Sequence, residues 1–244
     1  MHRQIVAYVL GCEPGDVRVV SSDTDRTGHD TGAYGSTGIA VAGTATMRAA
    51  RALADAIAAR AASGEADDGK QLEAEGYCDG RSRSVAFTVQ GFRVAVCAGT
   101  GEILVLQSVQ AVDAGTVLNP VQLRGQVEGG VGQALGAALF EEVRLDPGGR
   151  VTTRALREYH VPVLADVPST EVLFAPTFDP FGPYGAKPMS EAPFNPVAPA
   201  LANAVRDATG VRLTALPLRR DRVYQQLQAA LGPAIPPVPA SQEE

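Results

Sequence analysis

The segment Gly182-Pro-Tyr-Gly-Ala-Lys-Pro-Met-Ser-Glu-Ala-Pro-Phe-Asn-Pro196 limits the local fold more than any other part of the chain. It contains two glycines and four prolines. Proline fixes φ and lacks a backbone donor, whereas glycine reaches backbone angles that other residues avoid, so this run predicts a stiff and irregular loop. Such loops commonly carry functional residues. Its lone carboxylate, Glu191, is therefore a candidate catalytic group.

The composition of the 244 residues, 45% hydrophobic and 20% charged, is that of a soluble globular protein. The net charge of -6, with no basic cluster beyond the three arginines within 219–222, argues against nucleic acid or an anionic membrane as partner. No apolar stretch approaches the roughly 20 residues of a membrane span. The three cysteines, Cys12, Cys78 and Cys97, have no metal-ligand spacing, so we expect a cytoplasmic protein without a structural metal site.

The first part of the chain predicts a helix at 2–10, a strand at Val17–Ser21, a polar loop at 22–38 and a long helix at about 39–62. The long helix is rich in alanine, so another stretch of backbone can approach it closely. Because helical sequence starts at the second residue, we expect further structure upstream. The region from Gly64 to Cys78 is polar and predicts a solvated connection.

The polar loop before the long helix is a candidate ligand loop. Ser36 and Thr37 are natural N-cap residues, and the free N–H groups at a helix start favour phosphate or another electron-rich group. The simpler alternative is that the two hydroxyls only cap their own helix. The four glycines within 23–38 favour the ligand loop.

A hairpin is predicted from strands at Ser84–Cys97 and Ile103–Val112. Asn119-Pro120 then predicts a helix start, and the helix should continue to about Val143. Four glycines on one stripe of this helix predict close approach by another backbone or by a flat ligand: Gly125, Gly129, Gly132 and Gly136. Gln126 and Gln133 share a face and could bind a heterocycle or an oxo group, although helix glutamines are more often simply solvated.

The remaining elements alternate short strands with helices. Strands are expected near Val151–Thr153 and at Glu171–Ala175, with helices at about 199–209, closed by Gly210, and at 219–231. A short edge strand is expected at Arg212–Leu216, and the proline-rich residues 232–244 should be a disordered tail. Together these elements predict an α+β fold, with helices packed on a mostly antiparallel sheet, in one domain over 1–231.

Several motifs occur in a specific order: VDAG and NP within 112–120, GQVEGGVGQALGAALFEEV at 125–143, GPYGAKPMSE at 182–191 and APALANAVRDATGVRLTALPL at 198–218. In this order they resemble the molybdenum hydroxylases, the xanthine dehydrogenase and aldehyde oxidase family. The resemblance runs from Met1 to about Leu227 and covers the C-terminal part of the family's molybdopterin-binding large subunit.

The resemblance implies a role for each motif. Glu191 matches the glutamate of the family pattern G-A-K-G-x-G-E, which acts as general base on a molybdenum-bound hydroxyl while hydride passes to a sulfido ligand. Gln126 matches the glutamine of G-Q-x-E-G-G, which lies beside the molybdenum oxo group. The loop that hydrogen-bonds the pterin is similar to Thr31, Gly32, Ala33, Tyr34, Gly35, Ser36 and Thr37. The pterin dithiolene holds the metal, so the family needs no protein ligand to molybdenum.

The resemblance also implies partners. It implies a molybdenum-molybdopterin cofactor, with the cytosine dinucleotide form left open, and iron–sulfur and FAD groups on other domains or subunits. The family's first cofactor domain has no counterpart here, so the remainder of the molybdopterin subunit is an expected partner. The substrate would be an N-heterocycle such as a purine, or an aldehyde. Pro188-Met189-Ser190 departs from the glycine-rich family pattern before the glutamate, which leaves that choice open.

Three hypotheses follow for the function. In the first, the chain is the C-terminal molybdenum-site segment of a hydroxylase and is catalytic only with the rest of its subunit. In the second, it is a non-catalytic cofactor-binding or assembly module, or a truncated product. In the third, it is an unrelated α+β domain in which Glu191 helps to cap the helix at Pro199. The motif order favours the first two.

Overall fold

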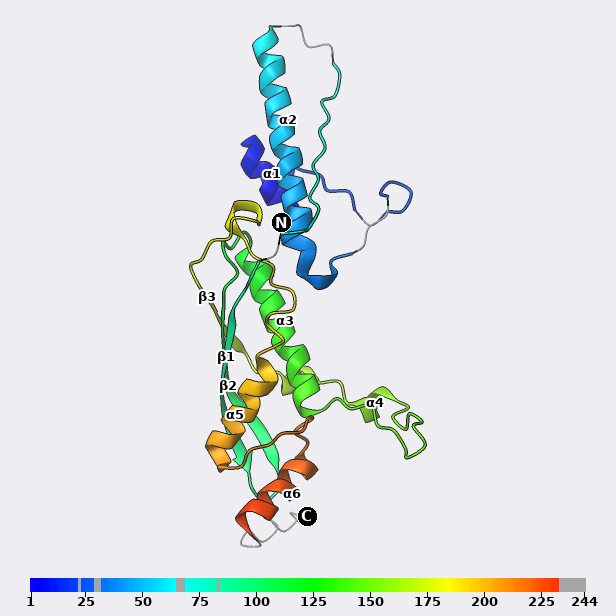
Figure 1. Ribbon diagram of the computed structural model, residues 1–244, viewed down its shortest axis with the longest axis vertical. Coiled ribbons are helices and arrows are strands. Elements are labelled where there is room, and N and C mark those ends of the chain that lie inside the picture. Colours follow the sequence, from blue (N-terminus) through cyan, green and yellow to red (C-terminus); the bar gives the residue numbers. More distant parts are fainter. Residues whose placement is uncertain (22, 29–31, 65–68, 83, 233–244) are drawn as a thin grey trace, which may run out of the picture. The chain divides into compact units, whose positions relative to one another are not determined.

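The computed structural model describes residues 1–21, 23–28, 32–64, 69–82 and 84–232 (Figure 1). These form two compact units. The first comprises Met1–Phe87, Asp113–Leu123 and Phe174–Ser190, and the second comprises Thr88–Val112, Arg124–Leu173 and Glu191–Glu244. Of the predicted tail at 232–244, all but Gly232 lies outside the described residues.

Two helices organise the first unit. Helix α1 (His2–Leu10) packs against α2 (Thr44–Ser63), with Nδ1 of His2 2.8 Å from the Thr46 hydroxyl oxygen. The predicted helix at 2–10 is confirmed. The long helix begins differently from its prediction, because a 3-10 turn (Tyr34–Ser36) and a π-helical turn (Gly38–Gly43) precede α2.

An extended part of the chain that follows α2 runs back beside this helix (Figure 1) and contacts it at Ala45 and Ala49. At Gly76 a Cβ atom would lie 2.1 Å from the Ala45 carbonyl oxygen, so only glycine fits there. The Arg60 guanidinium donates to the Lys70 carbonyl at 2.9 Å along the same helix. The predicted close approach of backbone to this helix is therefore confirmed.

The strand expected at Val17–Ser21 is wrong. A short 3-10 turn (Pro14–Asp16) is followed by chain that pairs with no strand among the described residues, and Val19 and Val20 are exposed. Their β-branched side chains raise β-propensity, but a strand also needs a neighbour to accept its backbone hydrogen bonds.

The sheet lies in the second unit. Strands β1 (Thr88–Cys97) and β2 (Glu102–Val112) form the predicted antiparallel hairpin, with an irregularity between Arg93 and Val94. Strand β3 (Thr170–Phe174) lies on the other side of β2, close to the predicted 171–175. The sheet is mixed rather than purely antiparallel, and the α+β class is confirmed.

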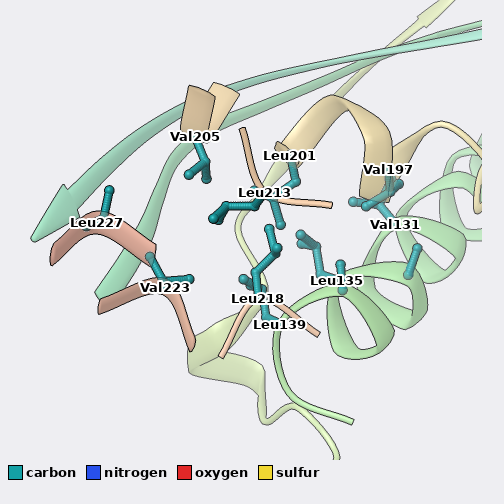
Figure 2. Packing of buried hydrophobic residues seen from close by; sticks show 12 residues of the cluster. Val131, Leu135, Leu139, Val197, Leu201, Val205, Leu213, Leu218, Val223 and Leu227 are labelled. Atoms are coloured by element: carbon teal, nitrogen blue, oxygen red, sulfur yellow. The ribbon is translucent and has the colours of Figure 1, made fainter. Parts of the chain in front are cut away.

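Three helices bury their apolar faces together in this unit (Figure 2). They are α3 (Pro120–Leu139), α5 (Val197–Thr209) and α6 (Arg220–Leu231). Helix α5 contributes residues at helical spacing, Val197, Leu201 and Val205, all fully buried. It ends at Gly210 in the left-handed conformation, as predicted. The sheet supplies partly buried side chains such as Phe92 and Val105 to the same core.

Helix α3 is shorter than its prediction, which placed its end at Val143. The N–H groups of Phe140 and Glu141 both donate to the Gly136 carbonyl at 2.9 Å, which closes the helix. Beyond it, the Glu142 carboxylate is bound by Arg219, at 3.2 Å, and by Arg222. These arginines lie about 80 residues later in the chain, so local sequence does not reveal them.

Two more expected strands are wrong. Near Val151–Thr153 there is only an isolated bridge between Leu145 and Val151, which precedes the short helix α4 (Leu156–Tyr159) and a 3-10 turn (Leu164–Asp166). At Arg212–Leu216 no strand forms, and the apolar side chain of Leu213 packs in the helical core. Across the described ranges, no helix is both long enough and apolar enough for a membrane span.

Candidate functional site

Glu191 lies on the predicted loop, and the loop exposes its side chain. The backbone N–H of Phe194 donates to the Glu191 carbonyl at 3.1 Å, which closes one turn around the buried Pro193. Helix α5 begins soon after, at Val197. The loop thus presents the exposed Glu191 carboxylate on a turn that contains the buried Pro193.

Gln126 lies on the exposed side of α3. The helix starts as predicted, because the Asn119 side-chain oxygen accepts the N–H of Gln122 at 3.0 Å. Gly125 and Gly129 lie next to Gln126 and are exposed, and a Cβ at either position would meet no described atom within 4 Å. This part of α3 therefore presents the Gln126 side chain beside two exposed glycines.

One contact brings the Glu191 loop to the same helix. A Cβ at Gly130 would lie 2.8 Å from the Cβ of Pro193, so the loop rests on the α3 backbone. Gly130 follows Gln126 by one helical turn, and Pro193 follows Glu191 by two residues. The second unit thus holds Gln126 and Glu191 on two segments that touch.

The predicted glycine stripe is only partly used for close packing. Only Gly136 lacks room for a side chain, since a Cβ there would lie 2.3 Å from the Glu141 side-chain oxygen and 2.9 Å from the Pro162 ring; Gly132 meets Val167 at an ordinary contact distance of 3.4 Å, and Gly125 and Gly129 meet no described atom within 4 Å. The closest backbone contact in the Gly-rich run is made by Gly130, which the stripe did not include. Periodicity identifies a helix face but not the segment that will cover it.

The candidate pterin loop belongs to the first unit. Thr31 lies outside the described residues, and the structure describes Gly32, Ala33, Tyr34, Gly35, Ser36 and Thr37. Gly35 and Ser36 both have positive φ, at 63° and 59°. Serine rarely adopts this conformation, and such strain commonly accompanies a functional loop. The π-helical turn at Gly38–Gly43 follows directly, and such turns are frequent at functional sites.

The capping role expected for Ser36 and Thr37 is wrong. Thr37 is the N-cap of the π-helical turn but makes no side-chain cap; its hydroxyl donates backwards to the Tyr34 carbonyl at 3.0 Å. Ser36 lies before the cap position, in the 3-10 turn. Thr37 has right-handed helical angles (φ -80°, ψ -11°), whereas an ordinary N-cap residue has extended ones.

Sequence reasoning missed a buried ionic cluster in the first unit. The Lys187 ammonium lies 2.7 Å from the Asp113 carboxylate, and the Thr177 hydroxyl donates to the same carboxylate. Burial raises the pKa of Asp113. Hydrogen bonds from Lys187 and Thr177 and the charge of Lys187 lower it by more, so the net pKa is below its ordinary value of 3.8. Asp113 lies in the VDAG motif and Lys187 in the GPYGAKPMSE motif. Their opposite charges were the signal from which the pair could have been predicted.

Two further findings concern sites elsewhere. A groove of about 900 Å³ in the second unit, lined by residues such as Phe140, Arg157 and His160, contains none of the candidate site residues. Within the ranges that the structure describes, no group of three or more His, Cys, Asp or Glu side chains could hold a metal ion. The candidate chemistry thus rests on Glu191, Gln126 and the loop before α2.

Comparison with known families decides the affiliation. A family model described as the molybdopterin cofactor-binding domain matches residues 1–168, more than half of the chain. The chain belongs to this family. The expected relationship to the large subunits of the xanthine dehydrogenase and aldehyde oxidase family is thereby confirmed. The predicted domain end at residue 231 stays a prediction.

Relatives extend the match beyond the family model. The "Probable hypoxanthine oxidase XdhD" of Escherichia coli (strain K12) is 34% identical over 244 residues, which cover 86% of this chain and 26% of that protein. The "Xanthine dehydrogenase molybdenum-binding subunit" of Escherichia coli O157:H7 is 32% identical over 266 residues, covering 93% and 35%. The chain thus spans about a quarter to a third of the length of these relatives.

A solved structure shows the same fold. The crystal structure of a Cu,Mo-CO dehydrogenase in its carbon monoxide reduced state matches with a TM-score of 0.85 and 24% identity, over 96% of this chain and 34% of that one. That protein acts on carbon monoxide, whereas the relatives above are named for purines. The fold of this molybdopterin cofactor-binding family therefore does not select the substrate.

The residues present fit a molybdopterin cofactor. Beside Gln126, a Cβ at Gly125 or Gly129 would meet no described atom within 4 Å, and the glutamine amide offers both a donor and an acceptor. In the other unit, Gly35 is left-handed (φ 63°, ψ 24°) within the 3-10 turn that begins at Tyr34, and a change of hand within a turn can direct N–H groups toward an anion. Within its own unit, the first feature suits a heterocycle and the second suits an anion such as a phosphate.

Proposed function

We propose that this chain is the C-terminal part of the molybdenum-binding subunit of a molybdenum hydroxylase, which oxidises an N-heterocycle such as a purine, or an aldehyde. Family membership supports the cofactor class. The names of the two relatives, which refer to hypoxanthine and xanthine, support a purine as the first substrate to test. Catalysis requires the remainder of the subunit, because the chain corresponds to a fraction of its relatives.

Glu191 is the general base in this proposal. Its carboxylate is exposed on a turn with a buried centre, so it can accept a proton while its backbone stays fixed. When bound, the molybdenum cofactor supplies the oxygen-atom and electron-accepting chemistry. The protein contributes a proton acceptor at a defined position and a surface that orients the reactants.

Gln126 and the loop from Thr31 to Thr37 hold the cofactor in this proposal. The Gln126 amide would hydrogen-bond the oxo or heterocyclic part, since it can donate and accept at once. The loop would bind through its N–H groups and the hydroxyls of Ser36 and Thr37. The pterin alone and its cytosine dinucleotide are both compatible with these donors.

Electron transfer defines the expected partners. Oxidation of the substrate releases two electrons, so we propose iron–sulfur and FAD groups on other domains or subunits as carriers. The remainder of the molybdenum-binding subunit is the third partner. All three cysteines are free, which supports a reducing, cytoplasmic location.

The packing of Pro193 on Gly130 carries the proposal, because it joins the Glu191 loop to the Gln126 helix within one compact unit. The test is co-expression of the chain with the remainder of the subunit and its iron–sulfur and FAD partners. We expect molybdenum in the purified complex and dye reduction that depends on hypoxanthine or on an aldehyde. Molybdenum without turnover on any of these substrates would favour a cofactor-binding or assembly module.

Glu191→Gln tests the catalytic assignment. Loss of a general base typically lowers the rate by about 100- to 10,000-fold, and molybdenum content should not change. Glu171→Gln is the control, because it removes an exposed carboxylate from β3 in the same unit. Full activity in Glu191→Gln would exclude this residue as the base.

A further inference from the structure

The loop that carries Glu191 is anchored at Pro193. Glu191 is exposed, whereas Pro193 is buried two residues later. The hydrogen bond from the Phe194 N–H to the Glu191 carbonyl closes a turn around Pro193. The position of Pro193 therefore determines the position of the whole turn, including the Cα of Glu191.

Helix α3 fixes Pro193 from one side. Gly130 is buried, and any side chain there would meet the proline ring, since its Cβ would lie 2.8 Å from the Pro193 Cβ. Real Cβ atoms essentially never approach other atoms that closely. Alanine at position 130 would therefore push the ring off the helix.

Strand β2 fixes Pro193 from another direction. The fully buried side chain of Gln110 donates from Nε2 to the Pro193 carbonyl at 2.8 Å and to the Gln90 side-chain oxygen at 3.0 Å. Gln90 in turn donates to the Ser108 hydroxyl at 3.1 Å, and Ser108 lies 2.9 Å from the Thr170 hydroxyl oxygen. A buried polar chain across β1, β2 and β3 thus ends on the backbone of the Glu191 loop.

The polar character of Gln110 is difficult to explain by packing alone. Its Oε1 is buried and has no hydrogen-bond partner among the described residues, which is unfavourable. An apolar side chain of the same size would avoid that unfavourable term, but it could not donate to Pro193. The two hydrogen bonds that Gln110 donates, to the Pro193 carbonyl and to the Gln90 side chain, account for an amide at this position.

We infer that Gln110 and Gly130 are positioning residues that clamp Pro193 between β2 and α3 and thereby set the position of the Glu191 carboxylate. This inference rests on the proposed role of Glu191 as general base. The clamp itself is a property of the chain, so it can be measured without turnover.

Hydrogen exchange on the full chain tests the clamp. Gln110→Met removes the donor at nearly constant size, and Gly130→Ala displaces the ring. Each should speed exchange of the Phe194 amide, in the peptide covering 190–197, by about ten-fold or more. The double variant should exchange little faster than either single one, because both changes act through Pro193. If Gln110→Met does not fold, Gly130→Ala carries the test.

Val205→Ala is the matched control. Val205 is fully buried in α5, away from Pro193 in the sequence, so its variant lowers global stability without altering the clamp. After correction for global stability, its 190–197 peptide should exchange as in the wild type. Equal opening of this peptide in Val205→Ala, or unchanged exchange in both clamp variants, would overturn the inference.

Kinetics in the co-expressed complex separate the clamp from the proposed function. We expect Gln110→Met to lower kcat about 10- to 100-fold, with KM and molybdenum content close to wild type. In a Glu191→Gln background it should have no further effect. A wild-type complex that turns over no substrate would contradict the proposed function and leave the exchange result standing. Faster loop exchange with wild-type kcat would reject the positioning role alone.

Discussion

The Lys187 ammonium and the Asp113 carboxylate form an ion pair at 2.7 Å, and both side chains are only 11% exposed. Lys187 also donates to the Val85 carbonyl at 3.0 Å, and the Thr177 hydroxyl donates to Asp113. These contacts join three stretches of the first unit, at Val85, at Asp113 and at 177–187. The last of these stretches leads into Glu191.

Lys187→Met should lower the free energy of unfolding by about 3–5 kcal/mol, because it leaves the Asp113 carboxylate buried without its cation. Urea denaturation followed by circular dichroism measures the change. Arg81→Ala is the control: it breaks an exposed ion pair with Asp79 in the same unit and should cost less than about 1 kcal/mol. Equal losses of unfolding free energy in the two variants would show that the buried ion pair stabilises the protein no more than the exposed one.

The same pair makes stability depend on pH in the acid range. The folded-state pKa of Asp113 lies below its ordinary value of 3.8, so the unfolded chain binds this proton more readily than the folded one. The contribution is complete above that ordinary value and is lost as the pH falls through the folded pKa. Unfolding free energies measured from pH 6 down to pH 2 should therefore fall more steeply in the wild type than in Asp113→Asn. Parallel curves would contradict the assignment.

Alanine in place of Gly125 or Gly129 should raise the stability of helix α3 and lower cofactor binding. A Cβ at either position meets no described atom within 4 Å, so alanine should stabilise helix α3 by about 1 kcal/mol per site. If the helix surface at these two glycines receives the cofactor, the same variants should lower the molybdenum content of the complex. Gln225→Ala, at an exposed position of α6, controls for helix propensity and should leave molybdenum unchanged. Stabilised variants with full molybdenum content would contradict a cofactor role for this surface.

Elements with strong local signals could be predicted from the sequence. The spacing of Val197, Leu201 and Val205 and the stop at Gly210 define α5, and β-branched runs define the hairpin. Predictions failed where a distant residue decides the outcome. Helix α3 ends at Leu139 instead of Val143, and the Glu142 carboxylate beyond it binds arginines about 80 residues later.

The residues of the candidate site also divide into those that local sequence predicts and those that depend on a distant partner. Glu191 could be identified because glycines and prolines mark its loop, and Gln126 because it lies in a recognisable motif. Gln110 could not be identified, since its partner Pro193 is 83 residues away and no local pattern distinguishes it from another strand glutamine. Which glycine of α3 meets the loop depends on how the elements pack, which periodicity does not encode.

Ser36 offers a way to separate backbone strain from side-chain chemistry in the candidate pterin loop. Its φ of 59° is unfavourable for serine but not for glycine, so Ser36→Gly should keep or raise the free energy of unfolding, by up to about 1 kcal/mol. Ser36→Ala keeps the strain and removes the same hydroxyl. If that hydroxyl binds the cofactor, both variants should lower pterin and molybdenum content, measured by fluorescence after oxidation and by metal analysis, although their stabilities differ. If only the less stable variant loses cofactor, the loop contributes through its backbone and not through the Ser36 hydroxyl.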